Sequence, residues 1–243
     1  MKTYIINMLK DTQKRAYMEK LFSFKSFYEC EYQVAIEGKK LTPAQIDGMV
    51  DFEALKKRYG NGATLPAVGC SLSHWNVYCD MVEHQCPLAV IFEDDAIIND
   101  DSEKYIQKLQ EIIFNQDKPI VVLLTPLFAY NIHNPFIEID GYKVYKVLGG
   151  WMAAGYMINN QAAKLLKKNL YPIQYVADDW RIFEKFGIDI YGIVPHITSY
   201  KNGKGEIGTS IKENKLTFID RFKIWRGNTI GFIKGERLSK KKW

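Results

Sequence analysis

Three consecutive carboxylates, Glu93, Asp94 and Asp95, are the strongest chemical signal in this 243-residue sequence. They follow residues 88–92, an apolar run with the length and composition of a strand buried on both faces. Ligands of open α/β sheets bind beyond the carboxyl ends of the strands, and clustered carboxylates repel one another unless a cation screens them. Because hard oxygen ligands suit Mg²⁺ or Mn²⁺, we expect a divalent-metal site here. The alternative is a solvated acidic turn that caps the next helix.

A second acidic pair, Asp178 and Asp179, precedes Trp180 and a short helical pattern. Its functional interpretation is a general base, or a carboxylate that supports a metal site. The alternative is electrostatic, because acidic side chains at the start of a helix interact favourably with its macrodipole.

Three further positions could contribute to a binding site. His74 lies near the start of a predicted helix, where free N–H groups could hold an anion, although a histidine there is more often only hydrogen-bonded. Trp151 lies in the glycine-rich stretch 149–156 and could stack on a sugar ring, with tight strand packing as the alternative. His196, after Pro195, could complete a metal site.

The cysteines suggest neither disulfides nor a structural metal. Cys30, Cys70, Cys79 and Cys86 contain no CxxC pair, and a chain of this length folds without cross-links, so we expect them to be reduced. The histidines are scattered along the chain, which argues against a structural zinc site.

Apolar runs and helical spacing alternate along the chain, which predicts an α/β fold. Strands are expected at residues 3–8, 31–36, 88–92, 120–124 and 152–158, with a hairpin turning at Asp140-Gly141. Helices are expected after the caps Asp11, Thr42 and Ser102, over residues 67–84, and after Asp179. The alternation favours parallel strands in the first half, and the hairpin makes the sheet mixed in the second.

The charge is distributed unevenly. Residues 212–243 carry ten Lys and Arg against three Asp and Glu, a local charge of +7, so the total of +5 leaves −2 for residues 1–211. Aromatic residues are interleaved with these cations, which predicts a basic amphipathic helical tail attracted to anionic lipid. We therefore divide the chain into a domain at 1–211 and a tail at 212–243; a purely solvated tail is the alternative.

Several classes of protein are excluded or disfavoured. No apolar run is long enough for a membrane-spanning helix or a secretory signal, so we expect a cytoplasmic protein. The slightly acidic body carries no nucleic-acid-binding motif, so no nucleic-acid partner is expected. The absence of a GxxxxGK[ST] loop argues against a nucleoside triphosphatase.

Five short stretches occur in order between Tyr4 and Pro195. They are Tyr4-Ile5-Ile6-Asn7 with Arg15 following, Val68-Gly69-Cys70-Ser71-Leu72-Ser73-His74, Ile91-Phe92-Glu93-Asp94-Asp95-Ala96, Ala154-Gly155-Tyr156-Met157-Ile158 and Asp179-Trp180. Together they resemble glycosyltransferase family 25, the lipopolysaccharide and lipooligosaccharide glycosyltransferases of Gram-negative bacteria, which include β-1,4-galactosyltransferases. The resemblance implies a GT-A type, Rossmann-like mixed sheet flanked by helices, a nucleotide-sugar donor and a growing outer-core glycan as acceptor.

The resemblance also implies roles for single residues. The metal ligands would be Glu93 and Asp95, and the base would be Asp179 with Asp178 as the fallback; His196 is added as a metal ligand from its own position and not from the resemblance. The family pattern has no acid before its Asp-Trp pair, so Asp178 leaves open which carboxylate is the base. The residues expected to contact the donor are Asn7, Arg15, Ser73, His74, Asp94, Trp151 and Gly155.

The resulting hypothesis is an inverting, Mn²⁺- or Mg²⁺-dependent hexosyltransferase that uses a uridine diphosphate sugar, with galactose as first choice. Its acceptor would be lipid-linked lipooligosaccharide, met at the inner face of the bacterial inner membrane where the basic tail binds as a peripheral anchor. The alternatives are a UDP-glucose-dependent glucosyltransferase, a phosphoryl-transfer or hydrolytic enzyme that uses the three acids for Mg²⁺, and a catalytically silent membrane-surface adaptor.

Overall fold

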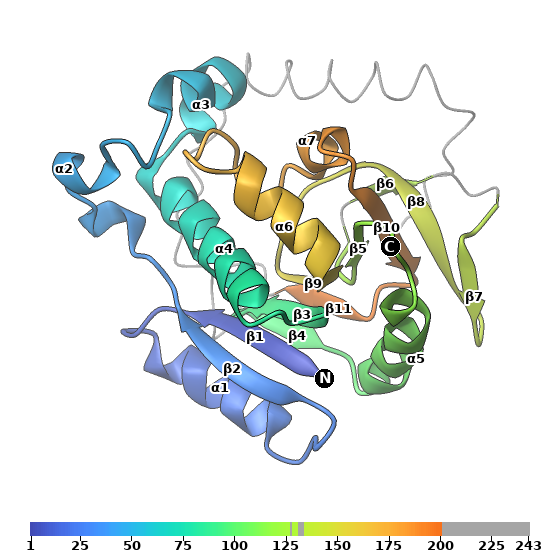
Figure 1. Ribbon diagram of the computed structural model, residues 1–243. Helices are drawn as coiled ribbons and strands as arrows, with labels where there is room; N and C mark the ends of the chain where they lie inside the picture. Colours follow the sequence, from blue (N-terminus) through green and yellow to red (C-terminus); the bar gives the residue numbers. More distant parts are fainter. Residues whose placement is uncertain (127, 131–133, 201–243) are drawn as a thin grey trace.

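A computed structural model describes residues 1–126, 128–130 and 134–200 of the protein (Figure 1). The predicted tail at 212–243 and the domain boundary at 211 lie outside these residues. Within the described ranges, no helix combines the length and the apolar character needed to cross a membrane.

A large mixed sheet forms the centre of the described fold. Its strands run in the order β2-β1-β3-β9-β5-β10-β8-β6, with β7 paired to β8. Their bounds are β1 Lys2–Asn7, β2 Glu29–Val34, β3 Leu88–Glu93, β5 Ile120–Leu123, β6 Phe128–Tyr130, β7 Ile137–Ile139, β8 Tyr142–Gly150, β9 Gly155–Asn159 and β10 Asp189–Val194. A separate two-stranded ladder pairs β4 (Ala96–Ile98) with β11 (Thr198–Tyr200).

The strand directions confirm the prediction of a mixed sheet. The pairs β2–β1, β1–β3 and β5–β10 are parallel, whereas β9 lies antiparallel between β3 and β5, and β8 lies antiparallel to β10. The predicted hairpin is also confirmed, because Asp140 and Gly141 join β7 to β8 with φ angles of 45° and 86°. Positive φ at both central residues is what a two-residue hairpin turn requires.

The predicted strand at 152–158 begins later than expected, at Gly155. Met152 has a φ of 86°, outside the β region, and its N–H donates to the Asp178 carboxylate at 3.0 Å instead of joining the sheet. Residues 151–154 therefore form a loop before the strand.

Helices cover both faces of the sheet (Figure 1). They are α1 Thr12–Phe22, α2 Pro43–Ile46, α3 Phe52–Tyr59, α4 Leu65–Glu83, α5 Ser102–Phe114, α6 Asn160–Asn169 and α7 Trp180–Lys185, with 3-10 turns η1 at Gly38–Lys40 and η2 at Gly60–Gly62. Buried side chains of α3, α4, α6 and α7 share one core with one face of the sheet, and those of α1 and α5 share a second core with the other face. The predicted α/β fold, a mixed sheet flanked by helices, is confirmed.

Strand β3 explains how the sheet holds these two cores together. Ala89 and Ile91 point into the core of α4 and α6, whereas Leu88, Val90 and Phe92 point into the core of α1 and α5. All five are buried, as the uninterrupted apolar run predicts. Burying a large apolar side chain contributes about 1.5–3 kcal/mol, so this strand is strongly anchored up to the point where the acidic residues begin.

Two of the predicted helix caps differ from the structure. Asp11 precedes α1, but its side chain makes no capping hydrogen bond. Ser102 is already the first residue of α5, and its hydroxyl donates to the Ile197 carbonyl at 3.0 Å. The serine therefore fastens the helix to the segment before β11 instead of capping it. Thr42 does cap α2, in a capping box with Gln45.

Helix α4 begins with a tight backbone contact that matters for the site. Thr64 caps the helix by accepting the N–H of Ala67, and Gly69 in its second turn packs against the chain that follows β2. A Cβ atom at Gly69 would lie 2.5 Å from the Ile36 carbonyl oxygen and 2.6 Å from the Gly38 nitrogen. Since only glycine allows this approach, it brings the first turns of α4 against the carboxyl end of β2.

Candidate active site

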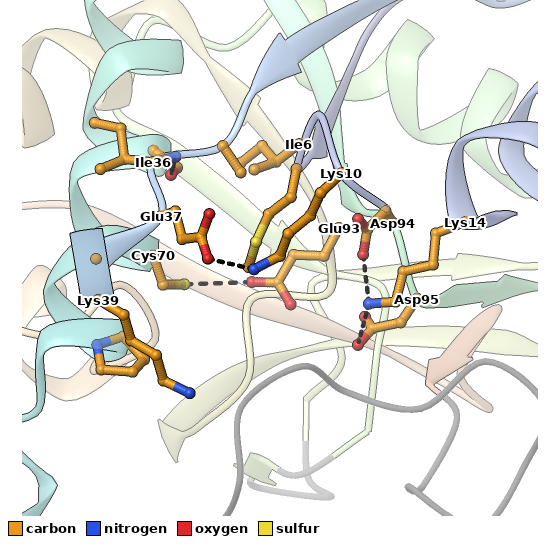
Figure 2. A pocket seen from close by; sticks show the side chains of 15 residues that line it. Ile6, Lys10, Lys14, Ile36, Glu37, Lys39, Cys70, Glu93, Asp94 and Asp95 are labelled. Atoms are coloured by element: carbon orange, nitrogen blue, oxygen red, sulfur yellow. Dashed lines mark hydrogen bonds and ion pairs between the residues drawn. The ribbon is translucent and has the colours of Figure 1, made fainter. Parts of the chain in front are cut away.

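A pocket opens where β1, β2 and β3 end, beside the first turns of α4 (Figure 2). Its lining residues are Ile6, Met8, Lys10, Lys14, Ala35, Ile36, Glu37, Gly38, Lys39, Pro66, Cys70, Ser73, Glu93, Asp94 and Asp95. The carboxyl ends of three parallel strands meet here, which is the ligand-binding edge of an open α/β sheet. The predicted acidic residues thus line a pocket, and lysines share it with them.

Asp94 is held by two partners on its own side of the pocket. One carboxylate oxygen accepts a hydrogen bond from the Lys14 ammonium at 2.8 Å, and the other accepts one from the Asn7 amide at 2.7 Å. Burial raises the pKa of Asp94 above its ordinary value, against the opposing effect of Lys14. Asn7 and Asp94 were both predicted to contact the donor; in this structure they bind each other, and Asp94 lines the pocket.

Glu93 and Asp95 have different electrostatic environments. Burial favours the protonated form of Glu93, but the hydrogen bonds from His74 at 3.1 Å and from Cys70, together with nearby positive charge, outweigh it and lower the pKa of the carboxyl. Burial raises the pKa of Asp95 to about 6, and the negative charge of Glu93 contributes to the rise. The Lys14 ammonium lies 3.9 Å from Asp95. Two half-buried carboxylates that repel each other form an oxygen-rich site that a divalent cation would stabilise.

His74 and Ser73 are both engaged within the protein. His74 is buried, and its Nδ1 atom lies 2.8 Å from the Tyr156 hydroxyl, so the ring joins Tyr156 to Glu93. The Ser73 hydroxyl accepts the N–H of Ile36 and donates to the Gly69 carbonyl. Ser73 lines the pocket, whereas His74 orients a residue that does.

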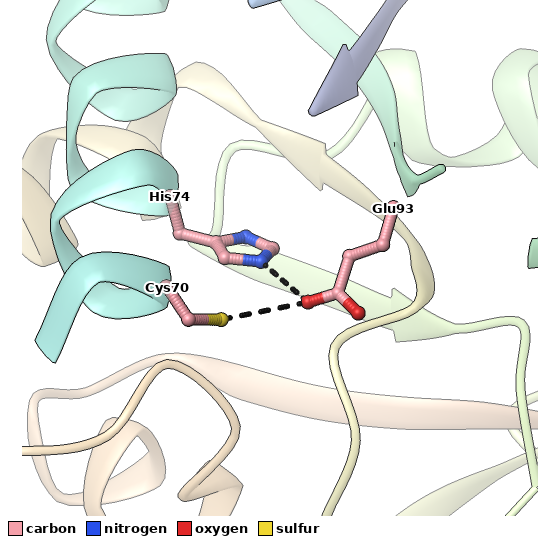
Figure 3. A group of neighbouring side chains, drawn as sticks. All are labelled: Cys70, His74 and Glu93. Carbon is pink, nitrogen blue, oxygen red and sulfur yellow. Dashed lines mark hydrogen bonds and ion pairs between the residues drawn. The ribbon is translucent and has the colours of Figure 1, made fainter. Parts of the chain in front are cut away.

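The predicted metal ligands are not brought together as a set. Within residues 1–126, 128–130 and 134–200, the group of three nearby ligand atoms is formed by Cys70, His74 and Glu93, all within 4.8 Å of one another (Figure 3). Glu93, Asp95 and His196 do not form such a group. His196 is half-buried in the loop between β10 and β11, where burial lowers its pKa.

The other three predicted donor contacts, Arg15, Gly155 and Trp151, lie in different surroundings. Arg15 pairs with Glu19 at 2.6 Å and lies over the Tyr32 ring at 3.4 Å, on a part of α1 that does not line the pocket. Gly155 faces a crowded core, because a Cβ there would lie 3.0 Å from the Thr198 hydroxyl oxygen. Trp151 is 36% exposed in the loop before β9, which leaves its ring open to a ligand.

The two candidate bases occupy contrasting positions. Asp179 is 0% exposed, and one of its oxygens accepts hydrogen bonds from Arg58 at 2.6 and 2.7 Å and from the Tyr59 hydroxyl at 2.7 Å. Asp178 is partly exposed and accepts the N–H of Met152. Burial raises the pKa of Asp178, and the nearby charge of Glu93 adds to the rise.

Sequence reasoning missed the pocket lysines and Cys70. Lys10, Lys14 and Lys39 lie on three different segments, and nothing in their local pattern distinguishes them from surface lysines. Cys70 had a usable signal: it precedes His74 by four residues, which places both side chains on one face of a helix.

Comparisons with solved structures show distant similarity. The structure of A197 from STIV covers 88% of this chain and 98% of its own at 9% identity, with a TM-score of 0.43. A glycosyltransferase involved in glycosylation of the major capsid of PBCV-1 covers 84% of this chain and 93% of its own at 8% identity, with a TM-score of 0.41. These scores are too low to support any conclusion beyond the similarity itself.

Sequence relatives are more informative. The lacto-N-neotetraose biosynthesis glycosyltransferase LgtE of Neisseria meningitidis is 24% identical over 167 residues, which are 60% of this chain and 59% of LgtE. A glycosyltransferase 25 family member of Drosophila melanogaster is 31% identical over 116 residues, which are 46% of this chain and 18% of that protein. The family profile of glycosyltransferase family 25 (LPS biosynthesis protein) matches residues 1–181, about three quarters of the sequence. The chain belongs to glycosyltransferase family 25.

Proposed function

We propose that this pocket binds a uridine diphosphate hexose, and that the protein transfers the hexose to a lipooligosaccharide acceptor with inversion at the anomeric carbon. The observation that carries the proposal is the mixture of charges in the pocket. Lys10 and Lys39 provide cations for a diphosphate, and Glu93 and Asp95 provide carboxylates for a divalent metal, all at the ligand-binding edge of the sheet.

Glu93 and Asp95 would hold Mg²⁺ or Mn²⁺. The fit rests on their chemistry: both are oxygen ligands, both are half-buried at the pocket, and the charge of Glu93 contributes to raising the pKa of Asp95. When bound, the ion supplies Lewis-acid stabilisation of the charge that develops on the departing diphosphate. Lys14 fixes Asp94 next to this site, which keeps the acidic turn in one conformation.

The base in this proposal is Asp178 instead of Asp179. An inverting transfer needs a carboxylate that can reach the acceptor hydroxyl and take its proton as the oxygen bonds to the anomeric carbon. Asp179 is fully buried and bound to Arg58, whereas Asp178 is partly exposed. Asp178 also has a raised pKa, which makes it a stronger base than an ordinary aspartate.

Trp151 is proposed as the platform for a sugar ring. Asp178 accepts the N–H of Met152, and the Trp180 indole N–H donates to the Met152 carbonyl at 2.9 Å. These two bonds hold the loop that carries the exposed Trp151 ring beside the proposed base. An aromatic face next to a catalytic carboxylate suits an acceptor sugar, whose apolar face can stack while its hydroxyl is deprotonated.

Galactose as the transferred sugar and lipooligosaccharide as the acceptor rest on the resemblance in sequence and on the relatives named for lacto-N-neotetraose biosynthesis. The chain covers 59% of LgtE, so the relative's activity does not transfer to this chain without a test. Binding of the tail 212–243 to the inner face of the bacterial inner membrane also belongs to this proposal and rests on its charge alone.

The test has two stages. Thermal unfolding with UDP is measured with and without Mn²⁺, and a metal-dependent rise in melting temperature is expected because a ligand that binds only the folded state stabilises it. Purified protein is then incubated with UDP-galactose or UDP-glucose and core oligosaccharide. Transfer from UDP-galactose supports the proposal, transfer from UDP-glucose alone corrects the sugar, and absence of both transfer and nucleotide binding refutes it.

Glu93→Gln and Asp95→Asn test the metal assignment. Both should abolish the Mn²⁺-dependent part of the UDP-induced shift and lower transfer at least about a hundredfold, because each removes a charged ligand. Asp47→Asn is the matched control, since Asp47 lies at the end of α2 and does not line the pocket. Undiminished transfer by Asp95→Asn would show that the metal is held elsewhere.

A further inference from the structure

Helix α4 and strand β3 bring together three side chains of different chemistry (Figure 3). Cys70 and His74 lie one turn apart on α4, and both reach the same carboxylate oxygen of Glu93, at the end of β3. The distances are 3.6 Å from the Cys70 sulfur and 3.1 Å from the His74 Nε2 atom. All three potential ligand atoms lie within 4.8 Å of one another.

We propose that Cys70, His74 and Glu93 form a binding site for a thiophilic divalent cation of the Zn²⁺ class. A thiolate, an imidazole and a carboxylate are the three ligand types that zinc takes in proteins, whereas Mg²⁺ and Mn²⁺ favour oxygen alone. The site is therefore chemically distinct from the one proposed for Glu93 with Asp95, although the two share Glu93. A zinc site here was not expected from the scattered histidines of the sequence. It uses a single histidine, and its carboxylate ligand, Glu93, is distant in sequence from Cys70 and His74.

The geometry is close to that of a zinc site before any metal is added. Two ligand atoms bound to a tetrahedral zinc at about 2.0–2.3 Å are separated by about 3.3–3.7 Å. The observed separations of 3.1 and 3.6 Å from the Glu93 oxygen are near this range. Binding therefore requires side-chain movement mainly between the Cys70 sulfur and the His74 Nε2 atom, which lie within 4.8 Å of each other, and the Cys70 thiol releases its proton to solvent as the thiolate binds the metal.

The imidazole of His74 is already oriented for this role. Its Nδ1 atom lies 2.8 Å from the Tyr156 hydroxyl, which in turn lies 2.7 Å from the Tyr78 hydroxyl, and all three residues are buried. Nε2 donates to Glu93 in the metal-free protein; when a cation binds, the ring proton lies on Nδ1, which donates it to Tyr156, and the Nε2 lone pair binds the cation. A hydrogen bond to the other ring nitrogen is the usual support of a metal-binding histidine.

The fourth coordination position faces the pocket. Cys70 and Glu93 both line it, so a cation can enter from solvent and retain a water ligand on that side (Figure 2). Three protein ligands and one open position are the arrangement of exchangeable zinc sites. Because Glu93 is shared, zinc bound at this site makes Glu93 unavailable to Mg²⁺ or Mn²⁺ and should inhibit transfer. The inhibition rests on the proposed function, whereas the zinc binding does not.

Binding is tested on the full chain after removal of metals with a chelator. Zn²⁺ is titrated in competition with a chromophoric chelator, and Co²⁺ is used separately as a spectroscopic probe of sulfur ligation. We expect tight Zn²⁺ binding that is at least about a hundredfold weaker in Cys70→Ser and His74→Gln, and a near-ultraviolet thiolate-to-cobalt band that Cys70→Ser removes. Tyr156→Phe should weaken binding about tenfold, because it removes the bond that orients His74.

Cys79→Ser is the matched control, because Cys79 lies on the same helix but outside the cluster. It should bind Zn²⁺ and Co²⁺ like the unaltered protein. Melting temperatures identify variants that fail to fold. If Cys70→Ser and His74→Gln do not fold, the Zn²⁺ affinity of Tyr156→Phe decides the test. Equal Zn²⁺ affinity in the unaltered protein, Cys70→Ser and Tyr156→Phe overturns the proposal, as does a cobalt complex without a thiolate band.

The transfer assay separates this inference from the proposed function. Zinc should inhibit Mn²⁺-dependent transfer, and each variant's inhibition is expressed relative to its own zinc-free rate. The concentration of zinc that halves the rate should rise at least about tenfold in Cys70→Ser. If no transfer occurs with any metal but the Cys70-dependent zinc binding is found, the proposed function fails and the cation site stands.

Discussion

The ion pair between Arg58 and Asp179 allows a sharp test of whether Asp179 is structural or catalytic. Two nitrogens of Arg58 bind one oxygen of Asp179 at 2.6 and 2.7 Å, and the Tyr59 hydroxyl binds the same oxygen at 2.7 Å. The other oxygen is buried without a hydrogen-bond partner among the described residues. Asp179 therefore depends on Arg58 for most of the compensation of its buried charge.

Arg58→Met should destabilise the protein by about 3 kcal/mol. Removing one partner of a buried ion pair costs about 3–5 kcal/mol, because the other charge stays buried. We take the lower end, since the Arg58 side chain is 36% exposed and water can enter its place. For a chain of this size, 1 kcal/mol lowers the melting temperature by about 2–4 °C, so Arg58→Met should lower it by about 6–12 °C.

Asp179→Asn should lower the unfolding free energy by less, about 1–2 kcal/mol, because the substitution removes the buried negative charge itself. The double variant should be more stable than Arg58→Met alone, since the buried carboxylate that the single variant leaves unpaired is gone. Denaturant unfolding of the four proteins measures this cycle. Turnover completes the assay: Asp179→Asn should keep transfer within about tenfold, whereas Asp178→Asn should lower it at least about a hundredfold without loss of stability.

Two results would refute this reasoning. If Asp179→Asn melts at the temperature of the unaltered protein and loses transfer a hundredfold, then Asp179 is the base. If Arg58→Met leaves the stability unchanged, then the ion pair does not compensate a buried charge.

Three further outcomes are expected. At saturating metal and donor, the transfer rate should fall about tenfold per pH unit as the pH drops below the raised pKa of Asp178, because only the deprotonated base accepts a proton. Asp178→Glu should keep this acidic decline in the pH–rate profile but at a shifted pH, whereas an unchanged decline in Asp178→Asn contradicts the prediction. Gly69→Ala should lower the unfolding free energy by about 1–3 kcal/mol, because its Cβ would lie 2.5 Å from a carbonyl oxygen. Gly62→Ala, whose Cβ has its nearest contact at 3.5 Å, should change the same free energy by less than about 0.5 kcal/mol. Thr64→Ala should lower the unfolding free energy by about 1 kcal/mol through loss of the α4 cap, as measured by denaturant unfolding, and an unchanged value would show that the cap is not needed.

The elements of the fold were largely predictable because each depends on local pattern. The apolar run at 88–92 and the helical spacing at 67–84 correspond to β3 and α4 within two residues at each end. The position of β9 was not predictable in the same way. It lies antiparallel between β3 and β5, and such an insertion depends on how the chain crosses the sheet rather than on the composition of the strand.

The site was predictable in its residue types but not in its pairings. Position after a buried strand indicated that Glu93, Asp94 and Asp95 would lie at a ligand-binding edge. Nothing in the sequence indicated that Asp94 would bind Lys14, 80 positions away, or that Asp179 would bind Arg58, 121 positions away. Contacts at such separations are set by packing of the whole domain, and they decide which carboxylates are free to act.

The buried hydrogen-bond chain behind Glu93 gives the acidic turn its asymmetry. Hydrogen bonds connect Tyr78, Tyr156 and His74 in series to Glu93, and the last bond contributes, with Cys70 and Lys14, to lowering the pKa of that carboxyl against the effect of burial. Its negative charge then contributes to raising the pKa of Asp95 to about 6. The ionised form of Glu93 is thus stabilised, and the ionised form of its neighbour Asp95 is destabilised. Because α4 supplies both His74 and Cys70, the helix that orients Glu93 also carries the other two ligands of the proposed zinc site.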